Sequence, residues 1–332
     1  MNVLGAAITS TLLTLLVVAW PSGSSQRSDV VQGISGVAPV VALNAGEDRY
    51  NVRFAAAPEV APLVVDLHQW SADHRGSFGN DFDLDLAVTV MGWNYLRPNL
   101  GSNRTEAGCC SAQAMERLTV AIDHALSSGM VDREQIFIVG ASGGGYAGLC
   151  ALMNGQPHIA AYNLWVPISD LEAWHSQQRN SSYGRDIRAC TASGDSLDVA
   201  EARRRSPLYM SAPAELPPTR IYTGIMDGWN GSVPITHSIR MFNRLADVTG
   251  HADMVLNDRE ILTLLEDRGT APNPQLPPAG ADGLPVHLTR TAGNLELIVF
   301  EGAHQGNSAT VLRDLMALHA DYLDARPDGA GD

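Results

Sequence analysis

Short apolar runs alternate along the chain with longer segments in which apolar residues recur every three or four positions. Such runs, bounded by turn residues, are typical of buried strands, and the longer spacing is typical of helices that cover a sheet. Strands are predicted at Tyr50 to Phe54, Leu63 to Leu67, Trp93 to Leu96, Gln135 to Val139, Ala160 to Val166, Arg220 to Gly224 and Leu295 to Phe300. Helices are predicted at Phe82 to Met91, Ala112 to Ser128, Gly145 to Met153, Thr236 to Val248 and Ala309 to Leu323. This order predicts an α/β fold with a mostly parallel central sheet and helices on both faces.

Two segments interrupt the alternation. Residues 170–218 are polar and rich in proline, and they have the length of a lid over a site. Residues 250–294 form a second insert, in which we expect a helix at Asp258 to Glu266 and a short strand around His287. Both inserts are predicted to belong to one large domain, residues 47–325.

The two ends of the chain differ from this domain. Residues 1–26 contain a long uncharged apolar segment followed by a polar stretch, which predicts a secretory signal peptide or an N-terminal anchor. Residues 27–46 show little periodicity and are predicted to be a linker. Residues 326–332 are predicted to be a disordered tail. We therefore expect a secreted or periplasmic protein.

The composition argues against a nucleic-acid partner and against several kinds of catalysis that need lysine. The 332 residues carry a formal net charge of −14, which argues against a nucleic-acid partner because phosphate binding needs clustered positive charge. The 22 basic residues are all arginine. A chain without lysine contains no Walker A phosphate loop, no pyridoxal-phosphate Schiff base and no Ser-Lys dyad. We expect no cofactor, and a nucleophilic serine would need a histidine as its base.

The segment Gly-Ala-Ser-Gly-Gly, residues 140–144, joins a predicted strand to a predicted helix. A serine held at such a tight turn needs residues with almost no side chain two positions before and after it, and Gly140 and Gly144 supply them. The alternative is a glycine-rich helix N-terminus without chemistry. Because the pattern is framed by a strand and a helix, it favours Ser142 as a nucleophile.

Two more chemically active residues follow predicted strands. In an open parallel sheet, ligands bind beyond the carboxyl ends of the strands, and Ser142, Asp227 and His304 each occupy such a position. Their order along the chain is that of an α/β-hydrolase triad. His304 would take the serine proton during attack and return it to the leaving group, while Asp227 would hold the correct imidazole tautomer.

With these residues the chain resembles the α/β-hydrolase superfamily and, within it, the prolyl oligopeptidase family. The resemblance spans roughly residues 50 to 323 and is carried by the glycine-flanked serine, Pro62 to His68, Arg97 to Ser102, Val131 to Ile136, and Asp227 with the turn that leads to Val233-Pro234. It implies the α/β-hydrolase fold. It also implies an oxyanion hole made by the backbone N–H groups of Gly143 and Trp70, with Gln69 beside it.

The resemblance further implies an acyl-enzyme route. Peptide-cleaving relatives usually carry an N-terminal propeller, and the residues before the first predicted strand are too few to build one. We therefore expect a serine esterase that acts on small-molecule or polymeric carboxylic esters. A serine peptidase is the alternative, and a non-catalytic binding protein with a hydrolase fold is a third hypothesis.

Three assignments have competitors. Asp170 also follows a predicted strand and competes with Asp227 as the triad acid. The segment from Asp227 to His304 is longer than the family usually shows, so His287 is the alternative base. His68 ends a predicted strand and could be a catalytic base, but it is predicted to be a structural histidine that hydrogen-bonds the oxyanion loop around Gln69 and Trp70.

Aromatic residues suggest a substrate surface. Trp174 and Trp229 fall in loops on the predicted site face and would suit an apolar, aromatic or sugar-bearing acyl group. Packing of the lid against the rest of the domain is the alternative.

Four cysteines remain, and an exported chain keeps disulfides. We expect one of the adjacent pair Cys109 and Cys110 to bridge to Cys190; Cys110 is taken as the partner, although no residue decides between them. Cys150 is predicted to be an ordinary buried apolar residue. A zinc site is disfavoured because adjacent cysteines lack the spacing that lets two thiolates reach one tetrahedral ion.

The aspartates at 81, 83 and 85 resemble a calcium-binding loop. They lack the glycine and the distal glutamate that such a loop needs at the required spacing. We therefore expect a solvated helix start rather than a metal site.

Overall fold

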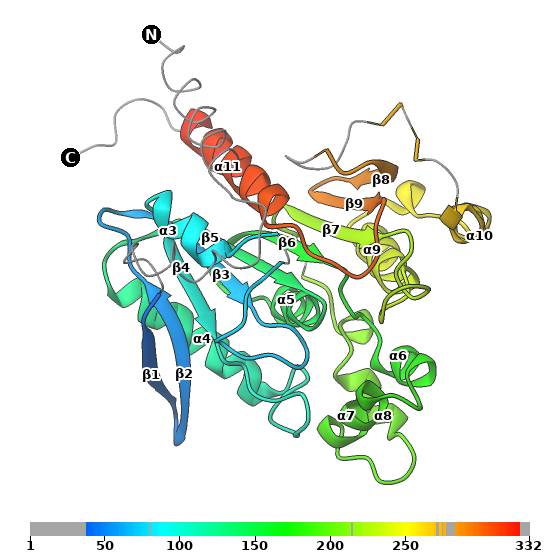
Figure 1. The fold of residues 1–332 in the computed structure, drawn as a ribbon, viewed down its shortest axis with the longest axis horizontal. Coiled ribbons are helices and arrows are strands. Elements are labelled where there is room, and N and C mark those ends of the chain that lie inside the picture. Colours follow the sequence, from blue (N-terminus) through cyan, green and yellow to red (C-terminus); the bar gives the residue numbers. More distant parts are fainter. Residues whose placement is uncertain are drawn as a thin grey trace, which may run out of the picture. The chain divides into compact units, whose positions relative to one another are not determined.

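The computed structural model describes residues 38–79, 81–213, 215–269, 272–273, 275–276 and 283–325. These residues form one sheet of nine strands in the order β1-β2-β4-β3-β5-β6-β7-β9-β8, with helices on both faces (Figure 1). The predicted signal peptide, most of the predicted linker and the predicted tail lie outside the described residues. Within the described ranges, no helix combines the length and the apolar composition that a membrane span needs.

The centre of the sheet is parallel and its edges are antiparallel. The parallel strands are β3 (Ala61–Leu67), β4 (Asn94–Pro98), β5 (Val131–Ala141), β6 (Ile159–Trp165), β7 (Thr219–Gly224) and β9 (Leu295–Phe300). Antiparallel pairs join β1 (Val40–Ala45) to β2 (Asp48–Ala55), β2 to β4, and β8 (Val286–Ala292) to β9. The mostly parallel sheet is confirmed.

Strand β1 lies within residues that were predicted to be a linker, so that boundary is wrong. β1 forms the edge of the sheet, where most of its residues are exposed or half-buried. An edge strand that buries only one residue carries little apolar periodicity, and its pairing with β2 decides its conformation.

The predicted helices are present. They are α3 (Leu84–Val90), α4 (Ala112–Ser127), α5 (Gly143–Met153), α9 (Thr236–Val248), α10 (Asp258–Glu266) and α11 (Ser308–Ala325). The region predicted to be a lid folds into short helices that the apolar pattern did not reveal, namely α6 (Leu171–Gln177), α7 (Ser182–Cys190) and α8 (Val199–Arg204). Side chains of Asp170, Ser181 and Asp198 cap their N-termini, as short helices require.

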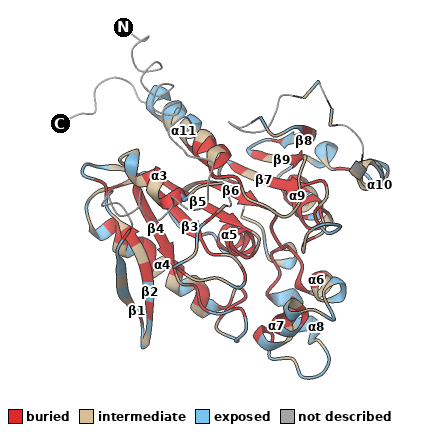
Figure 2. Ribbon diagram, in the orientation of Figure 1, coloured by how far each residue is buried: buried red, intermediate tan, exposed pale blue. Residues whose placement is uncertain are grey.

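Side chains on the central strands alternate between two cores. On β3, Leu63 and Val65 belong to the core that includes buried residues of α4, α5 and α9, whereas Val64 belongs to the core with buried residues of α3 and α11. Helix α5 is buried along its whole length, while α11 buries one side and exposes the other (Figure 2). Burial of α5 on all sides holds the turn before it rigidly at the carboxyl end of β5.

A buried ion pair lies behind the site edge of the sheet. Arg97 on β4 pairs with Asp66 on β3, both side chains are fully buried, and the Tyr95 hydroxyl donates to Asp66 Oδ2 at 2.7 Å. Arg97 Nε also donates to the carbonyl of Asp73 at 3.4 Å, in the loop that follows β3. The pair therefore joins two neighbouring strands to the loop beside the nucleophile.

We expect Arg97→Met to lower the free energy of unfolding by about 3–5 kcal/mol, because it leaves the Asp66 carboxylate buried without its partner. Urea denaturation measures the change. The matched control is Arg204→Met, which breaks an exposed pair with Glu201 and should cost less than about 1 kcal/mol. Equal losses in the two variants would contradict this account.

Candidate active site

Ser142 lies at the turn between β5 and α5 in a backbone conformation that residues other than glycine rarely adopt. Its φ is 58° and its ψ is −117°. The Ser142 N–H donates to the Trp165 carbonyl at 2.9 Å, and the Ser142 carbonyl accepts the Tyr146 N–H at 2.9 Å. A non-glycine residue with positive φ persists only where its surroundings hold it, and such residues cluster at active sites.

Three side chains from distant parts of the sequence form one chain of hydrogen bonds. His304 Nε2 lies 2.8 Å from Ser142 Oγ, and His304 Nδ1 lies 2.7 Å from Asp227 Oδ2. Asp227 is fully buried, and its Oδ1 accepts the N–H groups of Gly228 at 2.9 Å and Val233 at 3.1 Å. A buried carboxylate that accepts Nδ1–H leaves Nε2 free to accept the serine proton.

The competing acid and base lie elsewhere. Asp170 caps α6 through Ala173 N–H at 3.0 Å and accepts the Tyr209 hydroxyl at 2.9 Å. His287 on β8 is 2.7 Å from Glu301. The long insert before His304 does not reroute the chain, because β8 pairs with β9 and returns it to the sheet edge.

The oxyanion loop and the turn at Ser142 approach each other through backbone alone. A Cβ added to Gly143 would overlap the Trp70 amide nitrogen and lie 2.9 Å from the Gln69 carbonyl carbon, so residue 143 must be glycine. The amides of Gly143 and Trp70 therefore lie beside one another, as the resemblance implies for an oxyanion hole. The Gln69 side chain points elsewhere and donates to the Phe78 carbonyl at 3.1 Å.

His68 has the structural role that the sequence suggests. Its Nε2 accepts the Leu100 N–H at 3.1 Å, so the proton is on Nδ1, which donates to the Gln69 carbonyl at 2.9 Å. Burial lowers the pKa of His68 to about 4, so the ring is neutral at pH 7 and fixes the oxyanion loop.

A cavity of about 290 Å³ opens at Ser142 and His304. Apolar and aromatic side chains of Phe78, Val166 and Tyr183 line it together with the oxyanion loop. Tyr183 comes from α7, so the lid region contributes a wall of the cavity. The space suits a small apolar group next to the scissile bond.

The predicted substrate contact at Trp174 is wrong. Trp174 is fully buried, donates from Nε1 to the Ser232 carbonyl at 2.7 Å and packs on Trp70, so it joins the lid to the domain. Trp229 is 71% exposed, lies over Arg268 and does not line the cavity at Ser142. Sequence position placed both residues in loops near the site but could not tell which way they face.

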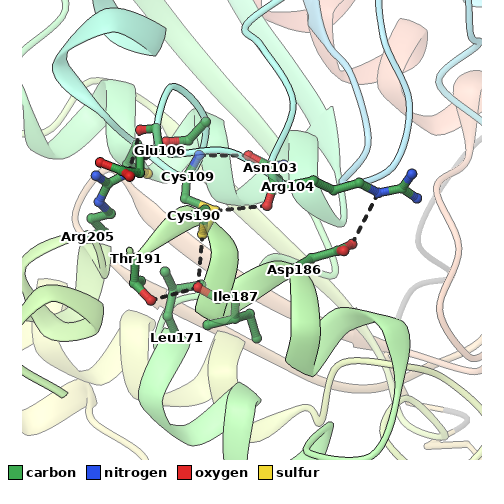
Figure 3. Close-up of a disulfide and its surroundings, with 12 residues drawn as sticks. Asn103, Arg104, Glu106, Cys109, Leu171, Asp186, Ile187, Cys190, Thr191 and Arg205 are labelled. Carbon is green, nitrogen blue, oxygen red and sulfur yellow. Dashed lines mark hydrogen bonds and ion pairs between the residues drawn. A yellow bond between two sulfur atoms is a disulfide. The ribbon is translucent and has the colours of Figure 1, made fainter. Parts of the chain in front are cut away.

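The predicted bridge from one of the adjacent cysteines to Cys190 is confirmed, but the choice of Cys110 as the partner is wrong. Cys109 pairs with Cys190 at the end of α7 (Figure 3). Cys110 pairs with Cys150 on α5. Cys150 is therefore not the ordinary apolar residue that was expected. Both adjacent cysteines have positive φ, 49° and 54°, which turns their side chains toward different helices. No free cysteine remains.

Asn103 links the loop that carries Cys109 and Cys110 to the oxyanion loop. Its Oδ1 accepts the Cys109 N–H at 2.7 Å (Figure 3), and its Nδ2 donates to the Trp70 carbonyl at 3.2 Å. The Trp70 indole N–H donates to Asp186 on α7 at 3.3 Å. Both ends of Trp70 are therefore held by segments that the Cys109–Cys190 bond ties together.

The aspartate run forms a helix start and a cap, but it is not solvated throughout as expected, because Asp85 is buried. Asp83 is the N-cap residue of α3, and Asp85 pairs with Arg53. Asp81 accepts the N–H groups of Ser308 and Ala309, each at 3.1 Å, and so caps α11 from a distant part of the chain. Among the described residues, no group of three or more metal-ligating side chains gathers.

The nine-stranded, mostly parallel sheet with its covering helices has the α/β-hydrolase fold, and solved structures share this fold. An acylaminoacyl peptidase in complex with Z-Gly-Gly-Phe-chloromethyl ketone gives a TM-score of 0.56 at 14% identity, over 93% of this chain and 45% of that one. Uncomplexed Pyrococcus horikoshii acylaminoacyl peptidase gives 0.54 at 16% identity, over 93% and 45%. A puromycin-hydrolyzing peptidase of Mycobacterium tuberculosis gives 0.53 at 19% identity, over 87% and 41%.

Residues 112–260, which include Ser142 and Asp227, match the prolyl oligopeptidase family. The match confirms the predicted resemblance to this family over that segment of the chain. The chain spans less than half the length of the three solved structures named above. No curated protein sequence matches it.

We expect Gly143→Ala to slow reaction at Ser142 by on the order of 10²-fold or more, since the added methyl pushes the Trp70 amide out of place. The rate of labelling by a fluorophosphonate measures the loss. Gly194→Ala is the control, because a Cβ there meets nothing within 4 Å. A labelling rate equal to that of the control would contradict the position of the oxyanion hole.

Stability should depend on pH through two buried histidines. Burial lowers the pKa values of His68 and His237 from 6.5 to about 4, so between these values the unfolded chain binds more protons than the folded one. The free energy of unfolding should therefore fall as the pH drops from about 6.5 to 4, by up to about 1.4 kcal/mol per pH unit for each histidine.

Urea denaturation across this pH range tests the expectation. His68→Gln should show a shallower dependence on pH than the wild type, whereas the exposed His158→Gln should keep the wild-type slope. The same slope in all three proteins would show that His68 is not buried as a neutral ring.

Proposed function

We propose that this chain is a serine peptidase that cleaves small peptides through an acyl-enzyme intermediate. The proposal is carried by one observation: His304 lies within hydrogen-bond distance of Ser142 Oγ, at 2.8 Å, and of Asp227 Oδ2, at 2.7 Å. It supplies a nucleophile, a general base and a buried acid in the geometry that acyl transfer needs.

In the proposed mechanism, Ser142 Oγ attacks the scissile carbonyl while His304 Nε2 takes its proton. The amides of Gly143 and Trp70 donate to the oxyanion as it develops, and Asp227 stabilises the imidazolium. His304 then returns the proton to the leaving amine, and the acyl-enzyme forms. His304 then takes a proton from a water molecule, which attacks the acyl-enzyme and releases the carboxylic acid, and the proton returns to Ser142.

Peptide cleavage replaces ester cleavage as the favoured reaction. The family match covers the segment with Ser142 and Asp227, and the three solved structures named above are peptidases. The cavity of about 290 Å³ supports a small apolar side chain beside the scissile bond. Ester hydrolysis, the expectation from the sequence, uses the same residues and is the contrasting outcome of the test.

We also propose that the chain works in an oxidising compartment outside the cytoplasm. Two disulfides pair all four cysteines, and disulfides of this kind persist in secreted and periplasmic proteins. Fractionation of the native host, with non-reducing electrophoresis of the recovered protein, would test this location.

Fluorophosphonate labelling tests the nucleophile. Wild-type protein should be labelled, and Ser142→Ala should not. Asp227→Asn should lower kcat by about 10⁴-fold because it disturbs the imidazole tautomer. Asp170→Asn is the matched control and should keep the wild-type rate, since Asp170 caps a helix outside the triad.

Peptide anilides and p-nitrophenyl esters with the same acyl group then decide the reaction. A peptidase should hydrolyse the anilide, and this activity should disappear in His304→Ala but persist in His287→Ala. Ester hydrolysis without anilide hydrolysis would overturn the peptidase proposal while leaving the triad in place.

A further inference from the structure

A second cavity adjoins the one at Ser142. Its volume is about 650 Å³, and the two cavities share the lining residues Trp70, Ser71 and Ala72 of the oxyanion loop. The two cavities therefore adjoin the same short segment of the oxyanion loop. Nothing in the proposed mechanism uses this space.

The second cavity is lined by cationic side chains in a chain that is strongly acidic. Arg75, Arg104 and Arg117 contribute to its lining, whereas Asp73 is its one lining carboxylate. The whole protein carries a net charge of −14. Three guanidinium groups thus gather beside the nucleophile, each with one carboxylate partner.

Two of these guanidinium groups keep nitrogens available for a ligand. Arg75 is bonded to Asp73 through Nε and Nη2. Arg104 faces Asp186 through Nε at 3.6 Å, and its terminal nitrogens extend beyond that carboxylate (Figure 3). Their side chains are 76% and 63% exposed. Arg117 instead pairs with Asp48 and lies over the Tyr50 ring, so it contributes charge more than contact.

The loop that carries Arg104 is held in place. Asn103 bonds to Trp70 and to Cys109, and the Ser102 hydroxyl accepts the Arg104 N–H at 3.2 Å. A guanidinium on a braced loop loses little freedom when it binds an anion, and planar guanidinium groups match carboxylates.

We propose that the second cavity is a subsite for a carboxylate of the substrate, held by Arg75 and Arg104. The inference rests on the proposed function and adds the substrate class: peptides or related acyl compounds with an anionic group at a distance from the scissile bond. The part of the substrate that joins the carboxylate to the scissile bond then passes over Trp70, Ser71 and Ala72, which line both cavities.

Matched fluorophosphonate probes test this subsite through Ser142 alone. One member of each pair has an alkyl chain that ends in a carboxylate, the other ends in the methyl ester, and a series of chain lengths covers the reach to the second cavity. At one or more lengths, wild-type protein should react roughly tenfold faster with the carboxylate, as a charge-assisted hydrogen bond provides. This preference should shrink as the ionic strength rises.

The double variant Arg75→Gln with Arg104→Gln should bring the ratio of the two rates to near one. Arg133→Gln is the matched control, because Arg133 is exposed at the opposite end of β5 from Ser142 and should keep the wild-type ratio.

Equal rates for both members at every chain length, or a preference that survives in the double variant, would overturn the subsite and leave the proposed function intact. Absence of labelling by either member would instead overturn the proposed function and the inference with it. The same comparison with peptides that have a free or an amidated C-terminus, or a succinyl or an acetyl N-terminus, then shows which side of the scissile bond occupies the cavity.

Discussion

The close backbone approach between the Ser142 turn and the oxyanion loop is the constraint on which the site depends. Gly143 lies against Trp70 and Gln69, and a Cβ on Gly144 would overlap the Leu67 carbonyl oxygen. No side chain fits between these segments, so their distance is set by main chain alone. Packing of a wholly buried α5 against the sheet maintains this contact and keeps Ser142 at its positive φ.

Three side chains hold the oxyanion loop in place through its carbonyl groups. His68 binds the Gln69 carbonyl as a neutral ring, Asn103 binds the Trp70 carbonyl, and the Arg97 pair reaches the Asp73 carbonyl. The two disulfides attach the Asn103 loop to α5 and to α7. Preorganised donors stabilise an oxyanion because they need no rearrangement during the reaction, and this bracing would preorganise the amides of the proposed oxyanion hole.

The lid region has a different part from the one that its sequence suggested. Its tryptophan does not face the substrate; Trp174 is a core residue between Trp70 and Tyr183. Tyr183 lines the cavity instead, and Asp186 meets both Trp70 and Arg104. Helix α7 therefore contributes Tyr183 to the small cavity at Ser142 and places the Asp186 carboxylate next to Arg104 at the larger cavity.

The sequence by itself determined the alternating elements, the serine turn and the order Ser142, Asp227, His304, because these depend on local periodicity and on positions directly after strands. It predicted neither β1 nor the lid helices, whose residues gain their conformation from partners distant in the chain. Only the tertiary structure decided between Cys109 and Cys110, turned Trp174 inward and brought Arg75 and Arg104 to one cavity. Which cysteines form a disulfide, which way a side chain faces and which charges cluster all depend on distances between separate segments. Those distances are set by the packing of the whole domain.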